Sequence, residues 1–113
     1  MRRLLRSWRH RVAVSGHSME PTLRAGDWLL VDPAAYARRA PAAGELVVVR
    51  DPRADERWLV KRVAAVGGDG ALRLAGDHAG HAAEPGLDAV PRTRLIGRAW
   101  LRYWPPRPLG RLR

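Results

Sequence analysis

The hydrophobic positions of this 113-residue chain fall into short apolar runs, separated by turns that contain glycine, proline and aspartate. Short runs bounded by such residues and rich in valine and leucine are typical of β-strands rather than of helices. Because little helical periodicity lies between the runs and no internal repeat is visible, the pattern predicts an all-β fold, either a barrel or a folded sheet. The expected strands are residues 12–14, 28–31, 46–49, 58–66, 71–74 and 95–103.

The connections and the ends of the chain indicate its domain organisation. Residues 67–70, Gly-Gly-Asp-Gly, are expected to form a hairpin turn. Residues 76–91 are rich in glycine, alanine and histidine and are expected to form a surface loop. We therefore expect one folded domain over 12–104, preceded by a basic amphipathic segment over 1–11 and followed by a proline- and arginine-rich tail over 105–113.

Arginine dominates the charged positions and gives the chain a formal net charge of +10. Such a charge is typical of proteins that bind nucleic acid or an acidic membrane surface. Near the N-terminus, Leu4, Leu5 and Trp8 would share one face of a helix flanked by arginines. That face fits a membrane-surface helix and, equally well, a short helix that packs onto its own domain. No apolar run approaches the ~18 residues of a membrane span, and no signal-peptide pattern is present, so we expect a cytoplasmic or peripherally membrane-associated protein.

Lys61 is the only lysine, whereas 20 residues are arginine. It lies inside the apolar run 58–66, where removal from water would favour the neutral amine over the ammonium. Arginine cannot take this part, because its guanidinium keeps its proton in proteins. Lys61 is therefore a candidate base, although a strand lysine that extends its charge to solvent fits the same position. The chain has no cysteine, which excludes thiolate chemistry.

Ser18 is the candidate nucleophile among the three serines of the chain. It follows an apolar run and a turn containing Gly16, and such a turn presents a hydroxyl to solvent. An ordinary turn serine fits the same pattern. A nucleophilic serine needs a base, and no G-x-S-x-G arrangement supports a histidine-assisted site. The residues therefore favour a direct dyad between Ser18 and Lys61.

Four segments in order along the chain resemble the sequence boxes of signal peptidase I-type serine proteases, and the resemblance spans residues 12–103, nearly the whole chain. The boxes lie at residues 15–23, which contain the S-M-x-P-T-L pattern, at 44–49, at 59–63 followed by Gly68-Asp69, and at 76–77. The resemblance implies a single small catalytic domain with the folded β-sheet barrel that signal peptidases share with LexA.

The resemblance also implies a mechanism. Ser18 would attack the scissile carbonyl and form an acyl-enzyme, while Lys61 would act as general base and then as general acid. The backbone N–H of Ser18 would form part of the oxyanion hole. The implied substrate is an extended protein segment with small residues before the cleavage site, which adds to a sheet edge. We expect no cofactor, no metal and a monomeric enzyme. The residues expected at the oxyanion hole or against the substrate are Gly16, His17, Met19 and Pro21.

The last box departs from the family pattern, which usually reads G-D-N and then S-x-D-S-R. Here Asp77 and Glu84 are expected to support the site, with Glu84 in place of the usual acid. The serine that orients the lysine is absent, so the strand around Lys61 is expected to carry more of its positioning. The short ending, from Asp77 through Val90-Pro91 to Gly97-Arg98 and without a membrane anchor, resembles that of the maturation proteases of nickel-type superoxide dismutase. This resemblance implies removal of an N-terminal propeptide.

Three other interpretations compete with a protease. His78 and His81 have the spacing of a metal pair, but without a third clear ligand such histidines are more often solvated. A basic β-barrel that binds nucleic acid without catalysis would explain the charge and the aromatic residues near the C-terminus, but not the serine box together with the single lysine. A LexA-type self-cleaving repressor would need a DNA-binding domain ahead of the serine, where only 17 residues lie.

Overall fold

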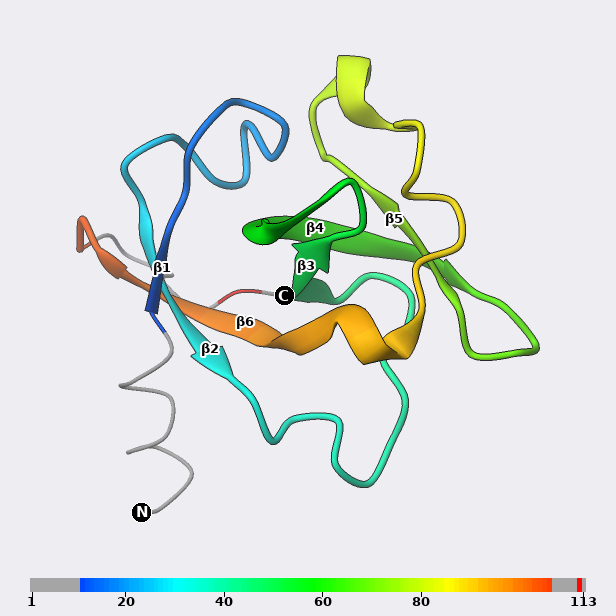
Figure 1. The fold of residues 1–113 in the computed structure, drawn as a ribbon. Helices are drawn as coiled ribbons and strands as arrows, with labels where there is room; N and C mark the ends of the chain where they lie inside the picture. The colour runs from blue at the N-terminus through cyan, green and yellow to red at the C-terminus, as the bar shows by residue number, and fades with distance from the viewer. Residues whose placement is uncertain (1–10, 107–111, 113) are drawn as a thin grey trace.

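The computed structural model describes residues 11–106 and 112, so nearly all of the N-terminal segment and most of the tail lie outside the described residues. Every run that was predicted as a strand forms one, which confirms the all-β prediction (Figure 1). The strands are β1 (Arg11–Ala13), β2 (Trp28–Asp32), β3 (Leu46–Asp51), β4 (Ala54–Val66), β5 (Leu72–Ala75) and β6 (Leu95–Trp104). Two short 3-10 helices, η1 (Ala79–His81) and η2 (Arg92–Arg94), lie between β5 and β6.

The strands form one antiparallel sheet in the order β1-β2-β6-β3-β4-β5. β1 and β5 stand at its two ends and do not pair with each other, so the sheet is open. Figure 1 shows β1, β2 and β6 on one side of the molecule and β4 and β5 on the other, with β3 between them. Of the two expected architectures, the folded sheet is therefore observed and the closed barrel is not.

Strand β3 separates two clusters of buried apolar side chains. Successive residues of a strand point to opposite faces, and residues 46–49 are all buried. Leu46 and Val48 belong to the first cluster, whereas Val47 and Val49 belong to the second. The first cluster also contains Met19, so the segment that follows β1 is anchored in the core.

Strand β4 is longer than the sequence pattern predicted. It begins at Ala54 rather than at residue 58, because it pairs with β3 back to Asp51 in a tight hairpin. Its first part carries exposed charged residues, which an apolar pattern cannot identify. The hairpin turn predicted at 67–70 is present: the Gly67 N–H donates to the Ala71 carbonyl at 2.8 Å, and Gly70 has a φ of +86°.

Candidate active site

The segment that carries Ser18 is a loop between β1 and β2 whose base and interior are both fixed. At its base, the Val14 N–H donates to the Asp27 carbonyl at 2.8 Å. Within it, Met19 and Leu23 are buried, and the Leu23 N–H donates to the Met19 carbonyl at 2.9 Å. The apolar residues of the S-M-x-P-T-L pattern thus hold the loop in the core and leave Ser18 half-buried at the surface.

Lys61 lies on β4 and is almost completely buried, with 4% of its side chain exposed. In the sheet it is opposite Val47 of β3. Its ammonium donates a hydrogen bond of 2.7 Å to Oε1 of Glu84. Burial of an amine disfavours its ammonium form, whereas a carboxylate partner favours that form, so the two effects oppose each other at this position.

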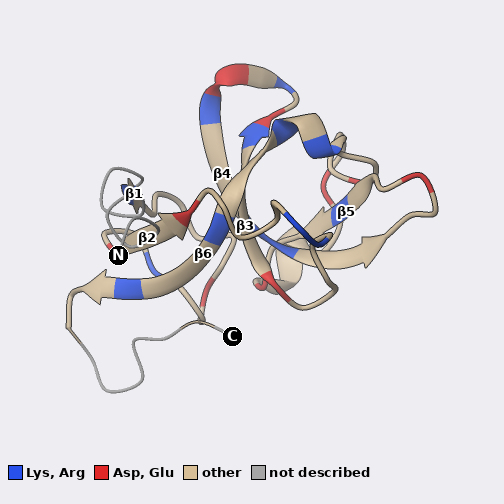
Figure 2. Ribbon diagram, turned by 90° about the horizontal axis from the view of Figure 1, so that it is seen from below, with Lys and Arg blue, Asp and Glu red and all other residues tan. Residues whose placement is uncertain are grey.

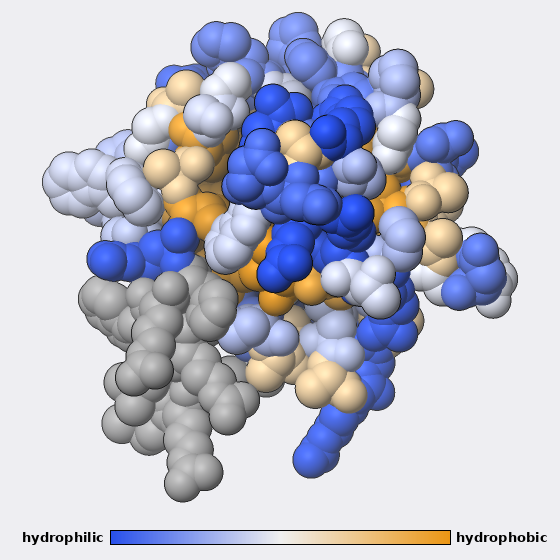
Figure 3. All heavy atoms as spheres, viewed as in Figure 1, coloured by the Kyte–Doolittle hydropathy of each residue, from blue (hydrophilic) through white to orange (hydrophobic). Residues whose placement is uncertain are grey.

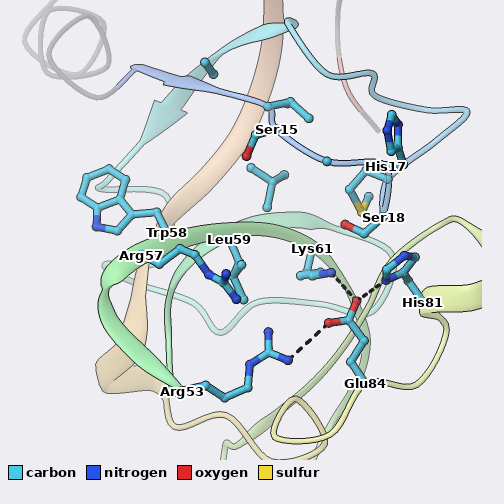
Figure 4. A pocket seen from close by; sticks show the side chains of 15 residues that line it. Ser15, His17, Ser18, Arg53, Arg57, Trp58, Leu59, Lys61, His81 and Glu84 are labelled. Atoms are coloured by element: carbon cyan, nitrogen blue, oxygen red, sulfur yellow. Dashed lines mark hydrogen bonds and ion pairs between the residues drawn. The ribbon is translucent and has the colours of Figure 1, made fainter.

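A cavity of about 340 Å³ brings the two candidate residues together. One wall is residues 13–19, the opposite wall is residues 57–61, and Arg53, His81 and Glu84 close one side. Figure 4 shows the Ser18 hydroxyl and the Lys61 amine pointing into the same space. The cavity therefore contains a hydroxyl that could act as a nucleophile and an amine that could act as its base.

On both long walls of the cavity, the described strands leave a backbone edge without a neighbouring strand. Within residues 11–106, β1 pairs with β2 alone. Residues 58–61 of β4 pair with β3 on one side, while β5 pairs with β4 only over 62–66. Among the described residues, the other edge of 58–61 therefore has no strand partner. An extended peptide placed between the two walls could pair its backbone with either edge.

The loop after β5 docks directly onto the nucleophile segment. The His78 N–H donates to the Ser18 carbonyl at 2.9 Å, and the Gly76 N–H donates to the His81 carbonyl at 2.8 Å. Gly76 is required for this approach, because a Cβ at that position would lie 2.4 Å from the Ser18 carbonyl oxygen. The last box therefore has direct contact with the residue that carries the candidate nucleophile.

Asp77 connects the same two segments through side chains. Its carboxylate accepts hydrogen bonds from Arg62 Nε and a terminal Arg62 nitrogen at 2.8 and 2.7 Å, and from the Thr22 hydroxyl at 2.5 Å. The Arg62 hydrogen bonds, with a smaller contribution from Thr22, hold the pKa of Asp77 below its usual range against the opposing effect of burial. Asp77 thereby ties the nucleophile segment to β4.

Glu84 lies at the centre of a second network (Figure 4). Its Oε1 is 2.7 Å from both Lys61 Nζ and His81 Nδ1, and its Oε2 is 3.5 Å from a terminal nitrogen of Arg53. Burial would raise the pKa of Glu84, but the hydrogen bonds from Lys61 and His81 outweigh burial and hold that pKa below its usual range. Lys61 therefore has a carboxylate partner from the last box in addition to its place in strand β4.

The structure brings most of the predicted site residues to the cavity. Those that line it are Gly16, His17, Ser18, Met19, Lys61 and Glu84. Pro21 and Asp77 do not line it. His17 is exposed, and its ring contacts Glu20.

Sequence reasoning missed Arg53, and it considered His81 only as half of a metal pair. Among the described residues, no group of three or more His, Cys, Asp or Glu side chains is placed to hold a metal ion. His81 instead contacts Glu84, three residues further along the chain. The sequence gives no signal that Arg53 and His81 both contact Glu84, because these contacts depend on how the loop after β5 folds back onto β4.

The arginines of the described part of the chain are distributed over several elements, and six of the thirteen are paired with carboxylates. Figure 2 shows basic positions on β4, β5 and β6 rather than on a single element. Arginine–carboxylate ion pairs join Arg39 and Arg98 to Glu45, Arg53 and Arg57 to Asp51, Arg62 to Asp77, and Arg94 to Asp55. Two of these pairs share Asp51, whose pKa is lowered to about 2: burial opposes this shift, and the Arg53 and Arg57 hydrogen bonds outweigh it.

Apolar residues also reach the surface. On the face shown in Figure 3 they lie between hydrophilic residues. The large exposed apolar side chains are Trp28, Trp58, Val66 and Trp104. Trp28 and Trp104 are direct partners in the pairing of β2 with β6, whereas Trp58 lines the cavity. No helix in the part of the chain that the structure describes is long and apolar enough to cross a membrane.

Comparison with known proteins gives consistent matches. Residues 4–75 match the family model described as signal peptidase, peptidase S26. The chain is 40% identical to signal peptidase I of Aquifex aeolicus over 52 residues, which cover 46% of this chain and 20% of that protein. It is 32% identical to the mitochondrial ATP-independent inner membrane protease subunit 1a of Arabidopsis thaliana over 123 aligned residues, which cover 88% of this chain and 73% of that protein.

Proposed function

The chain belongs to the signal peptidase family, peptidase S26, and we propose that it is a serine endopeptidase in which Ser18 is the nucleophile and Lys61 the general base. That it is a peptidase of the signal peptidase I kind follows from the family. The residue assignment is supported by one observation above all: the Ser18 hydroxyl and the only lysine of the chain line the same cavity.

In the proposed reaction, Ser18 Oγ attacks the scissile carbonyl while Lys61 Nζ accepts its proton. The resulting ammonium then gives a proton to the leaving amine, and water hydrolyses the acyl-enzyme by the reverse roles. The Ser18 N–H is the expected donor to the developing oxyanion. Removing one such donor typically costs about 3 kcal/mol of transition-state stabilisation. Position 16 is a glycine and offers no side-chain hydroxyl, so a second donor has to come from elsewhere.

The substrate is proposed to bind as an extended strand between residues 13–19 and 57–61. The unpaired edges of β1 and of β4 support this mode, because backbone hydrogen bonds to a sheet edge give affinity without requiring a particular sequence. Side chains that alternate along the peptide would then meet Met19 and Leu59 in the cavity. Small residues before the cleavage site remain the expected preference.

A nucleic-acid-binding module without catalysis has less support. Phosphate binding needs lysine or arginine side chains that are available to the phosphates. Six of the thirteen arginines among the described residues are paired with carboxylates, which reduces the number available to phosphates. The exposed tryptophans are also compatible with peripheral contact with an anionic membrane, which we retain as part of the proposal.

The test is cleavage of a peptide that carries small residues before the scissile bond. Ser18→Ala and Lys61→Ala are each expected to lower kcat/KM by roughly a thousandfold or more, because nucleophile and base act as a unit. Ser15→Ala is the matched control, since it removes another hydroxyl from the same loop, and it is expected to retain measurable cleavage. Cleavage by Ser18→Ala or Lys61→Ala at the wild-type rate would refute the assignment, provided that circular dichroism shows a folded variant.

The narrower substrate that we propose is the N-terminal propeptide of a nickel-type superoxide dismutase. The support is the short last box, Gly76-Asp77 followed by Glu84, which lacks the usual serine and arginine. Incubation with a dismutase precursor should release the propeptide and expose the new N-terminal amine, as mass spectrometry would detect. Cleavage of generic signal-type peptides without cleavage of the precursor would contradict the narrower substrate and leave the peptidase assignment intact.

A further inference from the structure

The Lys61–Glu84 pair creates a chemical difficulty for the proposed mechanism. Lys61 must be neutral to accept the Ser18 proton, yet its Nζ lies 2.7 Å from a carboxylate that favours the ammonium. The Lys61 side chain is only 4% exposed, so little water reaches the pair to stabilise the Glu84 carboxylate once Lys61 has lost its charge. Some other group has to offset the Glu84 charge when Lys61 gives up its proton.

His81 is in position to do this. Its Nδ1 is 2.7 Å from Glu84 Oε1, the same oxygen atom that Lys61 contacts. Its side chain is 41% exposed, so it can exchange protons with solvent. An imidazole gains and loses a proton in the neutral pH range, unlike the other candidate cation, Arg53, which stays charged and lies 3.5 Å from the other carboxylate oxygen.

We propose that His81 is a positioning residue for Lys61: acting through Glu84, it carries the positive charge that the carboxylate needs while Lys61 is the neutral base. The proposal rests on the assignment of Lys61 as general base.

The proton balance is simple. In the resting form, Lys61 is an ammonium and His81 is a neutral imidazole that donates from Nδ1. In the competent form, the N–H bond on Lys61 Nζ has broken and its electron pair stays on nitrogen. One proton has been taken up at the other ring nitrogen of His81 by exchange with water. The total number of protons is unchanged, so the competent form is reached without a net loss of a proton to solvent.

Other charged groups near His81 have to be considered. The His78 ring is 5.9 Å from the His81 ring, centroid to centroid. Arg53 contacts Glu84 directly, and Arg57 and His17 line the same cavity. Of these side chains, Arg53 is the one that contacts the Glu84 carboxylate, which Lys61 and His81 also contact. His78 therefore serves as the matched control, because it is a neighbouring imidazole without that contact.

The experiment is the pH profile of kcat/KM for the full chain with the peptide used above. For wild type, kcat/KM is expected to change by less than about threefold between about pH 7.5 and 9, since His81 supplies the exchange of charge. For His81→Gln, which keeps a hydrogen-bonding group but cannot titrate, kcat/KM is expected to fall about tenfold for each unit by which the pH is lowered over the same range, because Lys61 must then lose its proton to solvent in a single ionisation. His78→Gln should follow the wild-type profile.

A double-mutant cycle makes the route explicit. In a Glu84→Gln background, the additional His81→Gln change should leave the shape of the profile unchanged, because His81 acts only through the carboxylate. A wild-type profile for His81→Gln, or an equal change in His78→Gln, would overturn the proposal. If His81→Gln does not fold, His81→Asn provides the same comparison. Loss of cleavage in Lys61→Ala together with a wild-type profile for His81→Gln would leave the dyad standing and remove only the role of His81.

Discussion

Two adjacent residues of β4 make two ion pairs with the same loop, and the pairs differ in what they can do. Arg62 holds Asp77 through two hydrogen bonds, while Lys61 holds Glu84 through one. Asp77 also accepts from Thr22, so the Arg62 pair joins β4 to the nucleophile segment. Glu84 instead lines the cavity together with Lys61 and Ser18.

The chemistry of the two cations explains the difference. A guanidinium keeps its proton and fits a carboxylate with two parallel hydrogen bonds, so the Arg62–Asp77 pair is suited to holding the structure together. An amine can lose its proton, so the Lys61–Glu84 pair is suited to chemistry once the carboxylate has another cationic partner. In the proposed mechanism, one strand thus supplies a structural contact at position 62 and a reactive one at position 61.

The largest expected effect comes from exchanging the two kinds of cation. Lys61→Arg keeps a positive charge opposite Glu84 but removes the base, so kcat/KM should fall by about a thousandfold or more. Arg62→Lys is the matched control on the same strand: it weakens a two-bond contact and should retain cleavage within about tenfold of wild type. Both are measured in the peptide assay. An equal loss of kcat/KM in Lys61→Arg and Arg62→Lys would contradict a reactive role for the first pair and a structural role for the second.

Gly76→Ala should disturb both pairs at once. The new Cβ would meet the Ser18 carbonyl oxygen at 2.4 Å and the His81 Cβ at 2.7 Å, so the start of the loop has to move. We expect kcat/KM to fall about a hundredfold, the size of effect that a small displacement of catalytic groups produces. Gly80→Ala is the control in the same loop, because its Cβ would meet only His78 Nδ1, at 3.8 Å. Similar activity in both variants would argue against a close fit at position 76.

Asp77→Asn should affect stability more than chemistry. Replacing the carboxylate weakens its contacts with Arg62 and Thr22, and we expect the free energy of unfolding to fall by about 1–3 kcal/mol at pH 7. The pKa of Asp77 is lower in the folded protein, so its contribution is present above the unfolded pKa of about 3.9 and is lost as the pH falls through the folded value. The difference in unfolding free energy between wild type and Asp77→Asn should therefore shrink below about pH 4.

Urea unfolding at several pH values checks that prediction. Asp55→Asn is the control, because Asp55 pairs with Arg94 at an exposed site, so this change should not measurably alter the free energy of unfolding. A difference for Asp77→Asn that stays constant down to pH 2 would contradict the assigned role of the carboxylate.

Much of the fold follows from the sequence because its strands are apolar runs. The run 46–49 is buried on both faces, so its hydrophobicity is continuous and its strand was evident. The first part of β4 was missed for the opposite reason, since Asp55, Glu56 and Arg57 are charged and exposed to solvent. Whether the sheet closes could not be predicted, because that depends on which strands pair and not on how apolar each one is.

The candidate site divides in a similar way. Ser18 and Lys61 were identified because their residue types are unusual where they stand: a serine after an apolar run, and the only lysine within one. That the two residues line one cavity depends on how distant strands pair in the sheet, which cannot be inferred from their separation along the chain. The part played by His81 was missed because its contact with Glu84 spans only three residues in an irregular loop, a spacing with no meaning outside a helix.

The burial of the only lysine also gives the chemist a probe of this protein. Reagents that modify amines have one lysine side chain to modify, and just 4% of that side chain is exposed. Its rate of modification would therefore measure how often the cavity opens. An isotope placed on that nitrogen would give a single spectroscopic signal from the centre of the site, free of overlap with any other lysine.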